Sequence, residues 1–556
     1  MKPWEILALT FTKKAATEMK ERITAMVGAQ KARRVVMGTF HAVFVRFLRE
    51  FADSLGYPSQ FGIYDTSDSQ SAIKACIKEL GLDDKIYKPK EVLSHISKAK
   101  NNLITVNAYR NNQELLIADS HSRRPKFIDL YALYQKKMKD SGVMDFDDIL
   151  LNMNYLLRDN PEALHSISER FTHIMVDEYQ DTNFAQYVII KKLSQFHRNI
   201  CVVGDDSQSI YAFRGARVEN ILNFRKDYPE CRTFRLERNY RSTQTIVNAA
   251  NSIIAHNTDR IPKECYAVGE QGELIRILKA YSEQEEAMMT VSGILSRMRT
   301  DGAQYQDFAI LYRTNSQSRA LEEQLRRRNI PYMIYSGNSF FERMEVKDMT
   351  AYFKLAANPD DDVSFSRIVN KPSRTIGDTS LAALAECARA HQCSLFKAAF
   401  MPDTEVYGLR PAALVKIQAF CRMMESFSRR TDTVNAFDLA RQIADESGLY
   451  AFFKGDTSIE GLARTANVEE LLNSVESFVE ERMEDNFGDG EDVDSSYVVT
   501  LNDFIENVSL LSNVDVSGDE DVNNKVALMT VHSAKGLEYP YVFVAGMEEN
   551  LFPSSS

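Results

Sequence analysis

Two short apolar runs each end in polar residues that could serve phosphoryl transfer. Asp177 and Glu178 come directly after the run 174–176, and a second run, 200–203, leads into a polar loop that starts at Gly204. If both runs are parallel strands, their carboxyl ends lie at the sheet edge where ligands bind. An Asp there can hold Mg²⁺, and the next Glu can orient or deprotonate a water. Taken alone, the acidic pair is better explained as a strand end that caps the next helix, because short motifs often match by chance.

The second loop, residues 204–215, makes the chemical interpretation stronger. Its sequence offers an amide, Gln208, that could sense a phosphate, and Tyr211, Phe213 and Arg214 follow within a few residues. By itself this loop could be an ordinary Asp/Ser turn with two core aromatics. Because it follows the second apolar run as the acids follow the first, we expect both to reach the same sheet edge.

These groups must be positioned by parallel strands and helices. After Thr12, a suitable N-cap, apolar residues recur at three- and four-residue spacing as far as Gly28, which predicts a helix. The segment 316–328 repeats this pattern. Further apolar runs with polar ends suit strands buried on both faces, at 6–11, 308–312, 332–335, 526–531 and 541–545.

Two long segments lack strand signals and predict helical insertions into α/β domains. They cover roughly residues 68–141 and 342–513. The acidic stretches 480–494 and 515–521 are predicted to be solvated, mobile loops.

The composition limits the class of protein. A chain of 556 residues predicts three or four domains, and a net charge of −11 argues against a generally basic surface, so nucleic-acid binding would need local patches. The seven cysteines show no zinc-type spacing, which predicts neither disulfides nor a structural metal but buried thiols in a reducing cytoplasm. The sequence has no membrane-span or signal-peptide pattern, so we expect a soluble, cytoplasmic protein.

Six ordered blocks of this sequence resemble the motifs of superfamily 1 DNA helicases of the UvrD/Rep/PcrA type. They span nearly the whole chain, at residues 9–16, 38–41, 177–183, 204–215, 236–243 and 531–538. The resemblance implies an α/β fold with two RecA-like parallel-sheet domains, each with a mainly helical insertion. The implied division is 1–68 with 145–235 (first RecA-like domain), 69–144 (its insertion), 236–341 with 525–556 (second RecA-like domain) and 342–524 (its insertion).

The resemblance also implies ATP and Mg²⁺ as cofactors, bound in a crevice between the two RecA-like domains. For Arg241 a surface salt bridge is the alternative, which its neighbours Asn239, Tyr240 and Ser242 disfavour. The implied roles are Mg²⁺ binding by Asp177, general base by Glu178, coupling of the γ-phosphate to DNA by Gln208, adenine stacking by Tyr240, γ-phosphate contact by Arg241, and nucleotide contacts by Gly536 and Glu538.

Single-stranded DNA is the implied polymer substrate, together with single/double-strand junctions. Aromatic faces grip any sequence because every base can stack, and the helix start at Thr12 offers free N–H groups to a phosphate. Core packing is an equally good explanation for Phe11 and His41. The implied DNA-binding residues are Phe11, Thr12, His41, Tyr211, Phe213, Arg214 and His532.

The sequence departs from the family pattern in several places. Lys13, Ser207 and Phe213 stand where the family usually has Asn, Asp and Trp. No G-x-x-x-x-G-K-[S/T] phosphate loop occurs, and the family's late arginine motif is missing. Without the loop's amides and lysine the phosphates lose most of their cradle. We therefore expect a chain truncated at both ends that hydrolyses ATP poorly by itself.

The sequence thus predicts an ATP-dependent helicase or translocase that moves 3′ to 5′ on single-stranded DNA. Two alternatives remain open: a single-stranded-DNA-binding scaffold without ATPase activity, and the helicase subunit of a helicase-nuclease. A monomer is expected, and the second helical insertion is the expected contact for repair or replication proteins.

Overall fold

The computed structural model describes residues 2–335, 340–487, 498–511 and 524–553, and it contains two compact units. The first unit comprises Met1–Asp177, Thr182–Val202 and Phe340–Val514. The second unit comprises Glu178–Asp181, Val203–Ser339 and Asp515–Ser556. The four-part division implied by the family resemblance stays a prediction.

A four-stranded parallel sheet forms the α/β part of the first unit. Its strand order is β2-β1-β5-β6, with Leu7 opposite both Val36 and Ile174. The buried pattern of the central strand β1 explains why its sequence is continuously apolar. The structure confirms three predicted strands, with the bounds β1 Ile6–Thr10, β5 His173–Val176 and β6 Ile200–Val202. The fourth strand, β2 Val36–Thr39, was not predicted from the sequence.

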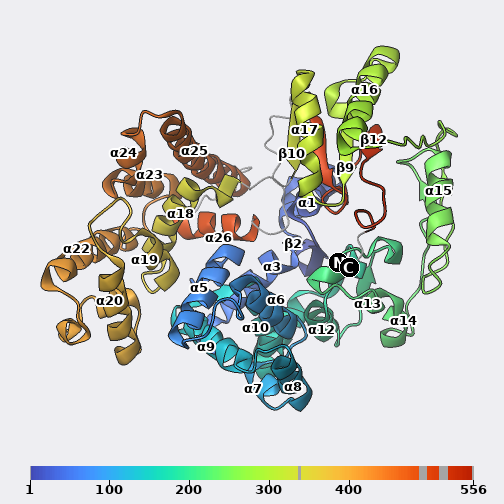
Figure 1. Cartoon of the computed structure of the whole chain (residues 1–556). Helices are drawn as coiled ribbons and strands as arrows, with labels where there is room; N and C mark the ends of the chain where they lie inside the picture. Colours follow the sequence, from blue (N-terminus) through green and yellow to red (C-terminus); the bar gives the residue numbers. More distant parts are fainter. Residues whose placement is uncertain (1, 336–339, 488–497, 512–523, 554–556) are drawn as a thin grey trace. The chain divides into compact units, whose positions relative to one another are not determined.

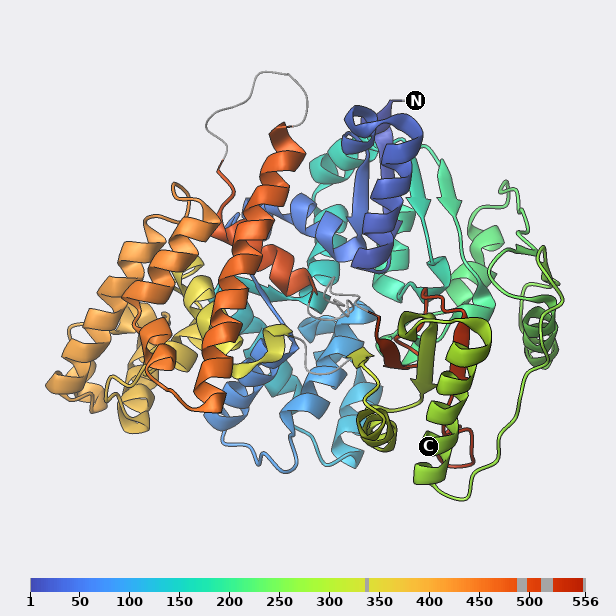
Figure 2. The ribbon, with the colours of Figure 1, turned by 90° about the horizontal axis from the view of Figure 1, so that it is seen from above.

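Helix α1 (Lys13–Val27) follows β1 and lies alongside the sheet (Figure 2). The Thr12 hydroxyl accepts a hydrogen bond from the Ala15 amide at 3.1 Å, and Gly28 ends the helix with a φ of 84°. These two caps confirm the predicted helix. The other helices of this α/β part are α2 Ala29–Arg33, α3 Phe40–Glu50, α4 Ala52–Leu55, α10 Phe146–Asp159, α11 Pro161–Arg170 and α12 Phe184–Leu193.

The first predicted insertion is helical, as expected. A short parallel pair, β3 (Gly62–Tyr64) and β4 (Val143–Asp145), stands at its two ends. Tyr109, Phe127 and Tyr131 are buried in its core. Its helices are α5 Thr66–Glu79, α6 Pro89–Asn101, α7 Val106–Arg110, α8 Gln113–His121 and α9 Phe127–Asp140 (Figure 1).

The second predicted insertion is also helical, but one boundary was predicted wrongly. The acidic stretch from residue 480 was expected to be a loop, whereas helix α25 continues to Phe487; residues 488–494 and 515–521 lie outside the described residues. Among the described residues, no helix combines the length and the apolar character needed to cross a membrane. The helices are α18 Met344–Ala357, α19 Asp362–Ile368, α20 Asp378–His391, α21 Leu395–Ala398, α22 Pro411–Ser428, α23 Ala436–Glu446, α24 Leu449–Lys454, α25 Ile459–Phe487 and α26 Leu501–Leu511.

The second unit has its own four-stranded parallel sheet, in the order β10-β11-β9-β12. Helices α16 (Glu283–Asp301) and α17 (Ser318–Arg327) pack with it around a core that includes Phe308, Ile310 and Leu528. The strands confirm the remaining predicted runs: β9 Phe308–Tyr312, β10 Tyr332–Tyr335, β11 Val526–Thr530 and β12 Tyr541–Val544. Its other α-helices and strands are α13 Glu219–Leu222, α14 Phe224–Asp227, β7 Arg238–Asn239, α15 Gln244–Ile254 and β8 Tyr266–Ala267.

All seven cysteines are free thiols, as the sequence predicts. The expectation that all are buried was wrong. Cys201 is exposed, three others are partly buried, and the buried ones are Cys76, Cys387 and Cys421.

A buried charge cluster joins helix α6 to the start of helix α10 in the first unit. The Lys100 ammonium, with no exposed surface, lies 2.7 Å from Asp145 and 2.8 Å from Asp148. Burial alone would lower the pKa of Lys100, but the two carboxylates outweigh it and raise that pKa. Burial, together with Asp145, raises the pKa of Asp148 to about 6. The cluster is stable because each charge is paired, and removing one partner leaves an uncompensated buried charge.

We predict that Lys100→Met destabilises the folded chain by about 3–5 kcal/mol, because Asp145 and Asp148 would then share a dry site without a cation. Urea unfolding followed by circular dichroism measures the loss. Lys98→Met is the matched control, since Lys98 lies exposed on the same helix. Equal unfolding midpoints for the two variants would contradict the prediction.

Candidate functional site

Glu178 is held in an unusual backbone conformation at the end of strand β5. Its φ is 51°, in the left-handed region that is energetically unfavourable for residues other than glycine. The buried side chain of Gln180 donates a hydrogen bond to the Glu178 carboxylate at 2.6 Å. The other end of the same amide accepts a hydrogen bond from the Asp205 backbone N–H at 3.0 Å. Gln180 therefore links the acidic strand end to the loop 204–215.

Gly204 allows these two segments to approach each other. A β-carbon at this position would lie 2.3 Å from Gln180 Oε1 and 3.2 Å from the Tyr179 backbone nitrogen. The Gln180 amide is bonded at both ends and cannot move aside without losing a bond. Position 204 consequently requires glycine for space.

Lys535 joins three of the predicted motif blocks within the second unit. Its ammonium donates to the Gln208 carbonyl oxygen at 2.8 Å, forms an ion pair with Asp181, and lies 3.9 Å from the Glu178 carboxylate. The Asp181 side chain is almost fully buried, and burial raises its pKa while Lys535 acts in the opposite direction. The block 531–538 is thereby fixed to the blocks 177–183 and 204–215.

The acids of the loop are held by a residue from outside the motif blocks. Lys263 forms ion pairs with Asp205 and, at 3.3 Å, with Asp206. Burial of Asp205 raises its pKa, but Lys263 and Gln208 outweigh this and lower it overall. The Gln208 amide donates to Asp205 at 2.9 Å, while the Gln208 residue as a whole is exposed.

Aromatic rings and arginines form a patch at the end of this loop. The Tyr211 hydroxyl donates to the His532 carbonyl oxygen at 3.3 Å, and the Phe213 and His532 rings meet edge to face with centroids 5.2 Å apart. Arg214 lies over both Tyr211 and Phe213. Tyr211 is buried, as in the core-packing alternative, but Phe213 is 67% exposed and is not a core residue.

His532 is a neutral ring in this patch at neutral pH. Burial lowers its pKa, and the neighbouring Arg313 and Arg214 lower it further. Arg313 also lies 3.2 Å from His532 Nδ1. The positive charge of the patch therefore comes from the arginines, and the imidazole contributes an uncharged ring.

Arg241 pairs with Glu538, a residue to which the resemblance also assigns a nucleotide contact. Arg241 Nε lies 2.7 Å from Glu538 Oε2, and both side chains are more than half exposed. This is the surface salt bridge that the sequence disfavoured, and such exposed pairs contribute at most about 1 kcal/mol. Tyr240 is 76% exposed, and Gly536 adopts a φ of 82°.

The remaining predicted site residues belong to the first unit. Asp177 is exposed at the end of β5, and its amide donates to the Leu9 carbonyl oxygen at 2.8 Å. Thr12 caps α1, and Phe11 is partly buried. His41, in the first turn of α3, packs edge to face on Phe146.

Sequence reasoning missed three residues that hold this site together, namely Gln180, Lys535 and Lys263. Gln180 and Lys535 lie inside the recognised blocks, so their position was a usable signal. Lys263 lies in a segment without a motif, and only the folded chain brings it to the loop.

Comparison with known proteins assigns the chain to a family. The UvrD/REP helicase N-terminal domain matches residues 1–229, and the UvrD-like helicase C-terminal domain matches residues 234–556. The chain therefore belongs to the superfamily 1 helicases, and among them to the UvrD/PcrA type.

Two relatives show the extent of the similarity. The "ATP-dependent DNA helicase PcrA" of Leuconostoc citreum is 39% identical over 553 residues, which cover 100% of this chain and 72% of the relative. The protein of the same name from Staphylococcus aureus (strain Mu50) is 38% identical over 552 residues, covering 99% of this chain and 72% of the relative.

His41 generates a prediction about pH. Burial lowers the pKa of His41 to about 4, from an ordinary value near 6.5, so the unfolded chain takes up this proton first as the pH falls. Stability from His41 is therefore present above pH 6.5 and is lost as the pH falls toward 4. We predict that His41→Gln loses less thermal stability than the unmodified chain between pH 7 and pH 5, measured by circular dichroism. His121→Gln changes an exposed histidine and is the control, so it should keep the pH dependence of the unmodified chain. If the melting temperatures of all three proteins fall equally between pH 7 and pH 5, His41 does not have this role.

Proposed function

We propose that this chain is the motor part of an ATP-dependent DNA helicase that moves 3′ to 5′ on single-stranded DNA. Membership of the UvrD/PcrA type supports the activity. The observation that carries the proposal is the position of Lys535, whose ammonium contacts Asp181 and the Gln208 carbonyl oxygen close to Glu178. Segments more than three hundred residues apart are joined where the family motifs imply nucleotide chemistry.

The donor set fits a magnesium nucleotide. Asp177 offers an exposed carboxylate at a strand end, which suits Mg²⁺, and Arg241 offers an exposed positive charge for phosphate oxygens. When bound, MgATP would supply the free energy of phosphoryl transfer. The weak, exposed pair of Arg241 with Glu538 suits an arginine that exchanges a carboxylate for a phosphate.

Glu178 is the proposed general base. Its left-handed backbone and its hydrogen bond from Gln180 fix the carboxylate in one orientation, which is what positioning a water molecule requires. A base of this kind accepts the proton of the attacking water. Asp177 would hold the metal, and Tyr240, with its exposed ring, would stack on the base of the nucleotide.

The loop 204–215 is the proposed link between nucleotide and DNA. At its start, Asp205 is bonded to Gln180 and thereby to Glu178; at its end, Tyr211, Phe213 and Arg214 form the aromatic patch. Gln208 lies between them and is held through its carbonyl oxygen by Lys535. A shift at the acidic end would therefore reach the DNA-binding end through a short chain of direct contacts.

Phe213 is the proposed stacking platform for DNA bases, with Tyr211 and His532 supporting it and Arg214 near the phosphates. Phe11, Thr12 and His41 are proposed as DNA contacts of the first unit. Stacking on an aromatic side chain contributes about 1–3 kcal/mol per base and is tolerant of sequence.

We predict that Phe213→Ala weakens single-stranded DNA affinity by about 1–3 kcal/mol, with little dependence on sequence. Fluorescence anisotropy at fixed salt measures this, because phosphate contacts make affinity salt-dependent. Phe196→Ala, at an aromatic side chain of similar exposure outside the motif blocks, should bind as the unmodified chain does. Unchanged affinity for Phe213→Ala would remove this residue from the DNA site.

A single-stranded-DNA-binding scaffold is the second candidate, because the 556 residues contain no G-x-x-x-x-G-K-[S/T] sequence. We predict that this polypeptide binds single-stranded DNA but hydrolyses ATP poorly. In a version with such a loop added ahead of residue 1, we expect DNA-stimulated turnover that Glu178→Gln abolishes while nucleotide binding persists. Coupled ATPase and nucleotide-binding assays test both points. If the loop-bearing version turns over equally well with Gln at 178, the base is assigned wrongly; if it never hydrolyses ATP, the scaffold is favoured.

A further inference from the structure

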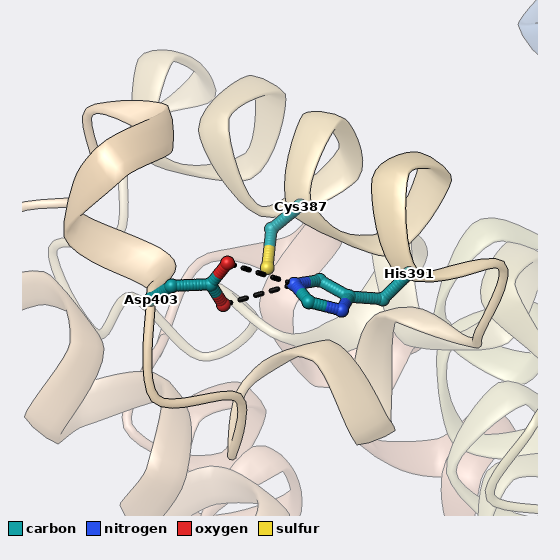
Figure 3. A group of neighbouring side chains, drawn as sticks. All are labelled: Cys387, His391 and Asp403. Atoms are coloured by element: carbon teal, nitrogen blue, oxygen red, sulfur yellow. Dashed lines mark hydrogen bonds and ion pairs between the residues drawn. The ribbon is translucent and has the colours of Figure 1, made fainter.

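Cys387, His391 and Asp403 bring three metal-binding side chains together in the second helical segment (Figure 3). Their ligand atoms all lie within 4.8 Å of one another. His391 Nε2 lies 2.9 Å from one Asp403 carboxylate oxygen and 3.0 Å from the other. The group is far along the chain from every motif block, and the proposed helicase chemistry does not use it.

The local fold explains this cluster. Cys387 and His391 are four residues apart on helix α20, which places them on one face. Asp403 comes from the residue before the short 3-10 turn Thr404–Tyr407, and the His391 and Tyr407 rings pack edge to face. The residue spacing did not indicate this group, because Cys-x-x-x-His is a weak pattern and the third member is twelve residues away.

The distances suit a small cation after modest adjustment. Zinc bonds of about 2.0–2.3 Å place tetrahedral ligand atoms about 3.5 Å from one another. The thiol of Cys387 is fixed by complete burial, whereas His391 and Asp403 are each about one third exposed and can rotate toward it. Only the partly exposed members need to move.

The local charge also suits a cation. The Asp403 carboxylate lies beside the His391 ring and the Cys387 sulfur, so the group carries a negative charge where a cation would bind. Binding of a divalent metal by the Cys387 sulfur would release the thiol proton.

We propose that Cys387, His391 and Asp403 form a zinc site that ties helix α20 to the turn Thr404–Tyr407. One sulfur, one nitrogen and one oxygen ligand match the borderline-soft character of Zn²⁺, and water would complete the tetrahedron. This site differs from the proposed magnesium site at Asp177, whose carboxylate offers only oxygen ligands.

Cobalt titration of the reduced, chelator-treated chain tests this proposal. Excess Mg²⁺ is present throughout so that sites with oxygen ligands alone are filled. We expect a thiolate-to-cobalt charge-transfer band in the near ultraviolet and the visible bands of tetrahedral Co²⁺, both saturating at one equivalent and both removed by Zn²⁺. Zn²⁺ should also raise the melting temperature.

Three variants separate the site from general effects of mutation. Cys387→Ser should lose the charge-transfer band and the thermal shift, and Cys421→Ser, at an equally buried thiol on α22, should keep both. His391→Ala changes a partly exposed side chain and should no longer saturate at one equivalent. The proposal is overturned if the unmodified chain shows no thiolate band, if the band survives in Cys387→Ser, or if His391→Ala still saturates at one equivalent; the cluster is then a histidine–aspartate ion pair beside a buried thiol.

Discussion

The ion pair between Lys535 and Asp181 is the interaction on which the candidate site depends. Asp181 has almost no exposed surface, so its charge needs a partner, and the partner comes from the far end of the sequence. Breaking a buried pair of this kind costs about 3–5 kcal/mol. The same ammonium also holds the Gln208 carbonyl oxygen. One cation thus fixes the mutual position of three segments that carry the proposed chemistry.

Much of the fold could be predicted because apolar runs and helix caps are local signals. The strand β9 and the helix α1 begin and end where the sequence indicates. The apolar run of β9 and the caps of α1 at Thr12 and Gly28 are both determined by residues that are adjacent in the sequence. The prediction of a loop from residue 480 onward was wrong, because it relied on overall charge and not on a local signal. Glutamate is a good helix former, and α25 continues through this acidic stretch to Phe487.

The site could be predicted only in part because its contacts are distant in sequence. The motif blocks identified Glu178, Gln208 and the aromatic patch, but not which side chains pair with which. Lys263 holds Asp205 from a segment with no recognisable pattern, and Arg241 pairs with Glu538 across 297 positions. The cluster of Cys387, His391 and Asp403 was missed for the same reason, because the separation of these residues along the sequence does not indicate that they meet in the folded chain.

Gln180 and Gly204 together hold Glu178, the proposed general base, close to the loop 204–215. The Gln180 amide is bonded at one end to Glu178 and at the other to the Asp205 backbone, and glycine is the only residue that lets the two backbones come this close. The loop therefore cannot move independently: it either carries the Glu178 side chain with it or breaks one of two partly buried hydrogen bonds. A displacement of residues 204–205 would consequently be passed to the Glu178 carboxylate through a single side-chain amide.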